Sequence, residues 1–386
     1  MTETDSPRRA PAAQPVHRLV ALDVLRGIAI LGTLGTNVWI FTDPDGLLGY
    51  LNGVGAAGWV ERVLQQLAQG KFLGLLTVMF GVGLAIQQRS AGRGGRRWPG
   101  RYPVRAGLLF LDGVVNFVFL AEFDVLTGYA LTGLIVAYLL ATGERAQRRW
   151  LLGAAAVHVA LLTLIAVALV AAGPAAPGAV AANPYADGSF LELAAFRLEN
   201  ALAFRAETLF ILPLSIALFL LGARLFRAGV FEPEEARLRR RLLLLGFGVA
   251  APIDLVAGVG IGGNAVLLTR YGTAPLVALG ILALVAEFSL RRPEPGFAGR
   301  RMAEVGRTAL SCYLLQNLLA SALCYGWGLG LAARVDPGAR VPFTVAVYLA
   351  VALAVVACAH LWLRRFARGP VEWLWHSGYR ALTGER

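Results

Sequence analysis

Ten apolar stretches divide the 386-residue sequence, and each is about as long as a helix needs to cross the hydrocarbon core of a membrane. Charged residues gather between the stretches. A water-soluble chain of this size would need more polar surface than that to cover its core. The sequence therefore predicts an all-α fold, a polytopic integral membrane bundle of about ten helices. The expected spans are 19–41, 64–88, 104–121, 124–141, 150–172, 208–226, 242–259, 273–290, 308–333 and 342–363.

Composition supports this class. Apolar residues other than tyrosine, together with glycine, make up about 66% of the chain, against roughly 45–50% in a soluble domain. An ordinary cytosolic enzyme, a disordered chain and a disulfide scaffold are thereby excluded. Two expected spans are weaker than the rest. Gln65, Gln66, Gln69 and Lys71 fall at 64–88, and Pro252 with Asp254 interrupts 242–259.

The basic residues predict the orientation. Of the 36 Lys and Arg residues, 28 fall in alternate segments between the expected spans, which is what the positive-inside rule requires of cytoplasmic loops. We therefore predict a transmembrane domain at 19–363 and cytoplasmic tails at 1–18 and 364–386. The long extracytoplasmic loop is expected at 173–207, with an amphipathic helix near 190–204. The expected environment is the lipid bilayer of a bacterial plasma membrane.

The net charge of +12 is thus explained without nucleic acid. The basic clusters are short and lack the aromatic residues that stack on bases, so we expect no nucleic-acid partner. Cys312, Cys324 and Cys358 fall inside expected spans with no ligand spacing around them, so no metal site is expected.

Polar residues inside the membrane are costly and therefore informative. In the first span, Arg26 and Asn37 are eleven residues apart, which is about 20° around a helix and roughly 16 Å along it. Asp23 and Thr33 fall near the same line. This stripe is expected to face the bundle interior or a watered cavity. An Asp23–Arg26 pair that only fixes the helix start is an equally open interpretation.

Further polar candidates follow in later spans. Asp112 and Asn116 share one helix face, and Glu122, Asp124 and Tyr129 come at the next outer turn. Two carboxylates there suit acid–base chemistry. Solvent exposure is favoured for Glu122, and helix capping is the alternative role for Asp124.

The ninth span carries Gln316 and Asn317, whose amides suit either a ligand or helix–helix hydrogen bonds. Trp373 and Trp375 follow the last span and are expected to anchor the cytoplasmic interface.

Several of these segments resemble the YeiB-like family of bacterial inner-membrane proteins, which carry the domain of unknown function 418. Residues 306–375 form the C-terminal part of that signature. The resembling stretches are LDVLRGIAILG at 22–32 with Asn37, GKFLGLLTVMFGVGLAIQQR at 70–89, FDVLTGYALTGL at 123–134, GRTALSCYLLQN at 306–317, YGWGLGL at 325–331 and GPVEWLW at 369–375.

The wider resemblance is to transmembrane acyltransferases of the heparan-glucosaminide acetyltransferase and membrane O-acyltransferase types, whose first span similarly begins with an Arg-Gly motif. It implies acyl transfer from cytosolic acetyl-CoA, with Arg26 near the CoA phosphates. A histidine of the O-acyltransferase branch is replaced by Asn37, residues 38–62 contain no histidine, and Asn116 stands where relatives often have one. Asp124 is then the remaining acid–base candidate.

Three hypotheses follow from the sequence. The first is a membrane acyltransferase with Asn37 and Asp124 as catalytic residues, and with Asp23, Arg26, Asp112, Asn116, Tyr129, Gln316 and Asn317 as donor- or ligand-binding residues. The second is a permease for a small metabolite, and the third is a non-catalytic membrane scaffold. No bound cofactor is expected, and acetyl-CoA enters only as a co-substrate. The acceptor and the oligomeric state are undefined.

Overall fold

The computed structural model describes residues 16–53, 57–172, 183–292 and 294–384, and every regular element in these ranges is helical. Eight helical segments are long and apolar enough to cross a membrane. The protein is therefore a multi-pass helical membrane protein. Most of the expected N-terminal tail and the start of the loop 173–207 lie outside the described residues. The eight segments are Val20–Phe41, Trp59–Arg93, Tyr102–Phe119, Glu144–Ala171, Ala201–Arg227, Pro233–Ile261, Ala265–Arg291 and Pro337–Leu363.

The other two expected spans form shorter apolar helices, α6 (Leu126–Leu140) and α15 (Ala309–Cys324). A helix of about 15 residues is roughly 23 Å long, against about 30 Å for the hydrocarbon core. Ten crossings with both termini cytoplasmic therefore stay a prediction.

The long segments are built from α1 (Val16–Phe41), α3 (Trp59–Ala68) with α4 (Lys71–Arg93), α5 (Tyr102–Phe119), α7 (Glu144–Ala172), α9 (Ala201–Arg227), α10 (Ala236–Leu243) with α11 (Ala251–Leu255), α12 (Ala265–Leu268) with α13 (Ala274–Arg291), and α16 (Arg340–Leu363). Short helices lie between or beyond them: α2 (Gly46–Gly53), α8 (Phe190–Glu199), α14 (Phe297–Arg307) and α17 (Pro370–Thr383). The expected C-terminal tail is therefore largely helical.

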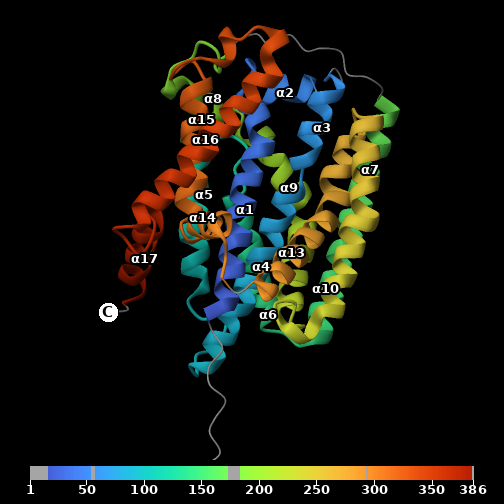
Figure 1. Cartoon of the computed structure of the whole chain (residues 1–386), viewed down its shortest axis with the longest axis vertical. Coiled ribbons are helices and arrows are strands. Elements are labelled where there is room, and N and C mark those ends of the chain that lie inside the picture. The colour runs from blue at the N-terminus through green and yellow to red at the C-terminus, as the bar shows by residue number, and fades with distance from the viewer. Residues whose placement is uncertain (1–15, 54–56, 173–182, 293, 385–386) are drawn as a thin grey trace, which may run out of the picture.

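Helix α1 lies in the middle of the bundle, α7 runs along one edge, and α17 projects on the opposite side (Figure 1). Of the most apolar 18-residue stretch of α1, 72% is buried inside the protein, whereas only 17% of the corresponding stretch of α7 is buried. The α7 surface is thus available to lipid, and α1 is the core helix. Its polar stripe therefore lies inside the bundle, as the sequence predicted.

Glycines set the closest helix crossings. A Cβ atom on Gly27 of α1 would lie 2.0 Å from the Met302 carbonyl oxygen in α14, and one on Gly306 would lie 1.8 Å from the Asp23 carbonyl oxygen. The glycine of the Arg-Gly motif is therefore a contact point between α1 and α14. Helices α4 and α9 cross in the same way, since a Cβ on Gly222 would lie 2.1 Å from the Val78 carbonyl oxygen.

The expected weak span at 242–259 is helical but irregular. Pro252 sits in the first turn of α11, between two π-helical segments, Leu244–Ala250 and Val256–Ile261. A third π-helical segment, Thr269–Thr273, precedes α13. Proline removes a backbone donor, and such insertions absorb the missing hydrogen bond. The chain therefore continues as one helical segment through the proline.

The expected amphipathic helix near 190–204 is α8 together with the start of α9. Its N-terminus has a capping box: the Glu192 N–H donates to Ser189 Oγ at 3.3 Å, and the Ser189 N–H donates to Glu192 Oε2 at 2.7 Å. The bond from the Ser189 backbone holds the pKa of Glu192 below its usual value.

The crossing of α4 and α9 gives a test of the fold. The substitution Gly222→Ala should lower the free energy of unfolding of the detergent-purified protein by about 1–3 kcal/mol, and with it the melting temperature. The reason is that the new methyl group overlaps the α4 backbone. Gly153→Ala in α7 is the matched control, since a Cβ there meets no atom within 4 Å. Equal melting temperatures for the two variants would contradict the close crossing.

Candidate functional site

Two cavities lie within the bundle, and the buried side chain of Tyr313 lines both of them. The inner cavity, of about 400 Å³, lies toward the basic segments that we predict to be cytoplasmic. The outer cavity, of about 50 Å³, lies between α1, the turn before α6, α9 and the segment that holds Arg270. The Tyr313 hydroxyl has no hydrogen-bond partner among the described residues.

The inner cavity is basic. Arg26 from α1, Arg105 from α5 and Arg307 at the end of α14 all line it. Arg26 Nη1 donates to Asp23 Oδ1 at 2.9 Å and keeps 37% of its side chain exposed. The predicted Asp23–Arg26 pair is therefore present, and Arg26 also faces a cavity. The Asp23–Arg26 pair and a stripe that faces a cavity are therefore compatible interpretations.

Trp375 lines the inner cavity instead of anchoring the interface beside Trp373. Its ring stacks on Tyr379, and the Arg105 guanidinium lies over both rings, 5.7 Å from Trp375 and 4.8 Å from Tyr379. Trp373 is 62% exposed, in keeping with the predicted anchor. The two tryptophans are two residues apart on a helix and so face different sides. The predicted anchoring role therefore fits Trp373 but not Trp375.

Helix α17 is fixed to the bundle by one carboxylate. Glu372 accepts hydrogen bonds from the backbone N–H groups of Leu310 and Ser311, at 2.8 and 3.1 Å, and from the Ser311 hydroxyl. A negative charge at these N–H groups also suits the α15 dipole. This contact joins the GPVEWLW segment to the GRTALSC segment, and α17 thereby closes one wall of the inner cavity.

A cleft of about 560 Å³ continues from the inner cavity toward the expected cytoplasm, and the two share Gln87, Tyr102 and Arg105. Arg96, Arg97 and Arg101 line it, together with the indole of Trp98. The cleft and the inner cavity together form a basic surface with aromatic walls.

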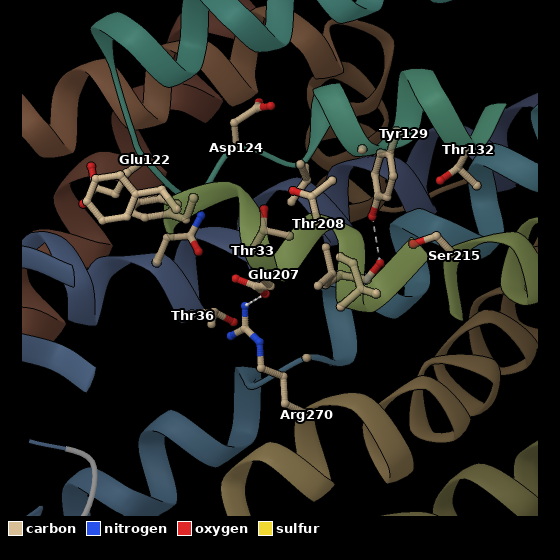
Figure 2. Close-up of a pocket in the computed structure, with 18 of the residues that line it drawn as sticks. Thr33, Thr36, Glu122, Asp124, Tyr129, Thr132, Glu207, Thr208, Ser215 and Arg270 are labelled. Atoms are coloured by element: carbon tan, nitrogen blue, oxygen red, sulfur yellow. Dashed lines mark hydrogen bonds and ion pairs between the residues drawn. The ribbon is translucent and has the colours of Figure 1, made fainter. Parts of the chain in front are cut away.

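The outer cavity holds Glu207 and Arg270, which form an ion pair of 3.1 Å (Figure 2). The Glu207 carboxylate also accepts a hydrogen bond from the Tyr271 hydroxyl, and 43% of its side chain remains exposed. Asn37 lines the same cavity, and its amide forms no hydrogen bond within the described part of the chain. A free amide and a partly exposed carboxylate therefore face one space.

The wall between the cavities is aromatic. Tyr129 lines the outer cavity, and its ring centroid lies 4.7 Å from that of Phe80, which lines the inner one. The Tyr129 hydroxyl pairs with Thr77 Oγ1 at 2.8 Å and donates to the Leu73 carbonyl at 3.1 Å. Tyr129 is thus held by α4, and the hydroxyl predicted to bind a ligand is engaged with protein.

Three of the predicted residues form one buried chain of hydrogen bonds. Asn317 Nδ2 donates to Asn116 Oδ1 at 3.1 Å, and Asn116 Nδ2 donates to Asp124 Oδ1 at 3.1 Å. The Asp124 carboxylate also accepts from the backbone N–H groups of Leu126 and Thr127 and from the Thr127 hydroxyl. Asp124 therefore caps α6, and its oxygens are occupied by protein donors. It still borders the outer cavity.

Arginines clamp the turn before α6. Glu122 is 1% exposed, and its Oε2 accepts from Arg197 Nε at 3.1 Å. The expectation of a solvated Glu122 is wrong, because α8 folds over the turn and brings Arg197 to it. Arg205 donates to the Glu122 and Asp124 carbonyls and lies 3.6 Å from the Asp124 carboxylate. Both arginines fall in the expected extracytoplasmic loop 173–207, and no partner was predicted for either.

Asp112 and Gln316 border neither the inner nor the outer cavity. Asp112 Oδ2 and both amide atoms of Gln316 are buried without a hydrogen-bond partner among the described residues. Within those residues, no group of three His, Cys, Asp or Glu side chains is placed to hold a metal ion.

The charges of the two weak spans pair with each other. Lys71, the single lysine of the sequence, lies 2.5 Å from Asp254, whose side chain is fully buried. Gln66 Nε2 and the Thr273 hydroxyl also donate to Asp254, at 2.7 and 2.8 Å. The pair joins the start of α4 to α11, close to Gly70 and Arg270 of the outer cavity.

Comparison with known proteins matches residues 225–381 to the model described as "Protein of unknown function (DUF418)". The chain is 32% identical to the uncharacterized protein YeiB of Escherichia coli (strain K12) over 390 residues, covering 93% of this chain and 96% of YeiB. It is 29% identical to the uncharacterized protein YxaH of Bacillus subtilis (strain 168) over 394 residues, covering 94% of each chain.

If Lys71 and Asp254 form a coupled pair, the double variant should be more stable than the single variant Asp254→Leu. Asp254→Leu alone should destabilise the protein by about 3–5 kcal/mol, because it leaves a buried ammonium without a counter-charge. Combining it with Lys71→Met should recover most of that loss, since both charges are then removed. The measurement is thermal unfolding of the two single variants and the double variant in detergent. Additive losses in the double variant would show that the two charges are not coupled.

Proposed function

The chain belongs to the DUF418 family of YeiB-like membrane proteins, and on that premise we propose that it is a transmembrane acyltransferase. It takes an acyl group from a coenzyme A thioester on the cytoplasmic side and transfers it to a hydroxyl or amine acceptor that enters from the outer side. The single observation that carries the proposal is the pair of cavities, one basic and one with a partly exposed carboxylate, that meet at Tyr313.

The donor side is argued from charge. Arg26, Arg105 and Arg307 converge on the inner cavity, and the adjoining cleft adds Arg96 and Arg97. Guanidinium groups suit phosphate oxygens, and coenzyme A carries several phosphate groups. The rings of Trp375, Tyr379 and Trp98 offer faces for an adenine base. The thioester then extends through the apolar part of the inner cavity toward Tyr313.

The chemical step is assigned to the outer cavity. The acceptor oxygen or nitrogen forms a bond to the acyl carbon, the carbon–sulfur bond breaks, and the thiolate leaves. Glu207 takes the acceptor proton as general base, because it lines the cavity with part of its side chain exposed; Arg270 orients the carboxylate. The free Asn37 amide donates a hydrogen bond to the acyl oxygen as negative charge develops there.

Asp124 takes a positioning role in this proposal. Its carboxylate is hydrogen-bonded to Asn116, Leu126 and Thr127, so it fixes the start of α6 and thereby the place of Tyr129. Asn317 and Asn116 extend this support to α15 and α5. Asp23 orients Arg26.

The test uses the full-length protein in nanodiscs, with acetyl-CoA binding and thiol release measured separately. Wild type should bind acetyl-CoA saturably, and Arg26→Ala should weaken binding about tenfold through the loss of a charge-assisted contact. Asn37→Ala should leave binding within twofold but lower acyl transfer by about 10²-fold or more, as for loss of an oxyanion donor.

Arg365→Ala serves as the control for Arg26, because it removes an exposed arginine that borders neither cavity. No saturable binding of acetyl-CoA by wild type would overturn the acyltransferase proposal. Unchanged affinity in Arg26→Ala would remove only the role given to that residue.

Transport of a small anion is the second candidate, and the Lys71–Asp254 pair favours it. A buried ion pair beside π-helical segments is an arrangement that a transporter can use to couple charge movement to helix movement. Substrate-dependent uptake into proteoliposomes without thiol release from acetyl-CoA would support this candidate over acyl transfer.

A further inference from the structure

A separate basic cavity of about 390 Å³ lies between the N-terminal end of α7 and the C-terminal end of α9. It shares no residue with the inner cavity, the outer cavity or the cleft. Four arginines line it, two from each helix: Arg145 and Arg148 from α7, and Arg224 and Arg227 from α9. One acidic residue, Glu144, accompanies them.

The four guanidinium groups are arranged around one space. The members of each pair are three residues apart, so they lie on the same helix face, and all four arginines are exposed. Arg227 Nη2 donates to Gln147 Oε1 at 2.7 Å, and Gln147 Nε2 donates to the Thr142 carbonyl at 2.7 Å. The α6–α7 connection thereby holds Arg227 at the cavity. None of the four forms an ion pair within the described part of the chain.

Arginines that serve only to orient the helices have no need to converge. Like charges brought together repel one another, and the repulsion is relieved by an anion that accepts several hydrogen bonds at once. Phosphate oxygens fit guanidinium groups in this way. The cavity therefore matches a phosphate group in charge and in the kind of hydrogen-bond donor that lines it.

The surroundings point to a lipid. Leu151 and Leu220 form the apolar part of the cavity wall. Trp150, which precedes Leu151 in α7, is 54% exposed, and such a tryptophan suits the headgroup level of a bilayer. Beyond it the α7 surface is apolar and open, with Leu152 56%, Val159 61% and Leu164 65% exposed. A ligand held by the arginines would have its other end against this surface.

We propose that this cavity binds the phosphate headgroup of an anionic phospholipid from the cytoplasmic leaflet, with its acyl chains lying along α7. Charge selects the anionic class. A zwitterionic lipid presents a cation next to its phosphate, and that cation would meet the same four arginines. Basic pockets between transmembrane helices on the cytoplasmic side are suited to such headgroups. The proposal is independent of acyl transfer, because it uses none of the residues assigned to that reaction.

The test is a lipid titration of the purified full-length protein, with bound lipid counted by native mass spectrometry. Phosphatidylglycerol, phosphatidylcholine and inorganic phosphate are the three probes. Wild type should bind phosphatidylglycerol at least tenfold more tightly than phosphatidylcholine. The double variant Arg145→Gln, Arg224→Gln takes one arginine from each helix, and neither side chain has a hydrogen bond within the described protein that its loss would break. It should weaken phosphatidylglycerol binding about tenfold to thirtyfold.

The matched control is Arg237→Gln with Arg240→Gln, which removes the same charge from exposed positions of α10 outside the cavity. Its affinity for phosphatidylglycerol should stay within twofold of wild type. An equal loss in the control would mean diffuse surface attraction and overturn the site. Displacement of phosphatidylglycerol by millimolar inorganic phosphate would mean a free-anion site, and it would overturn the lipid assignment.

Discussion

The scarcity of water in the hydrocarbon core is the constraint on which the rest of this structure depends. A charge placed there must find a counter-charge inside the protein. Within the expected spans Lys71 pairs with Asp254, and in the buried turn before α6 Glu122 pairs with Arg197. Each pair joins segments that are far apart in the sequence, so satisfying the charge also determines which helices are neighbours. Near the ends of the expected spans, Arg239 of α10 pairs with Glu287 of α13, and Arg340 of α16 pairs with Asp43 in the turn after α1.

Against this background, charges that are not fully paired become conspicuous. Arg105 and Arg307 line the inner cavity without an ion pair in the described residues, and Glu207 keeps nearly half of its side chain exposed beside Arg270. Unlike most of the paired charges above, these three side chains line the inner or the outer cavity. Water or a ligand that enters a cavity lowers the electrostatic cost of such a charge. That contrast, more than any single residue, distinguishes the cavities from ordinary packing.

Hydropathy predicted the fold class well, because it reports on the lipid directly. Each of the ten expected spans overlaps a long or short apolar helix of the structure. The pairing of side chains was not predictable, because it depends on contacts between distant segments. Lys71 and Asp254 each weaken the apolar character of an expected span, and neither local pattern indicates that the two side chains are in contact. Glu207 was not predicted because it is the last residue of the expected loop 173–207, and Arg270 because it falls between two expected spans. The polar stripe of α1 was predictable, since one helix contains it.

That stripe also sets a length scale for the proposed reaction. Arg26 lines the inner cavity and Asn37 the outer one, and both belong to α1. Eleven residues of helix separate them by roughly 16 Å along the axis. The close crossing at Gly27 and Gly306 fixes α1 against α14, so this spacing is rigid. A donor held by its phosphates near Arg26 must therefore carry its acyl group on a long arm to reach Asn37. The pantetheine arm of coenzyme A meets that requirement, and a compact acyl phosphate does not. The geometry of one helix thus favours a thioester donor over other activated acyl groups.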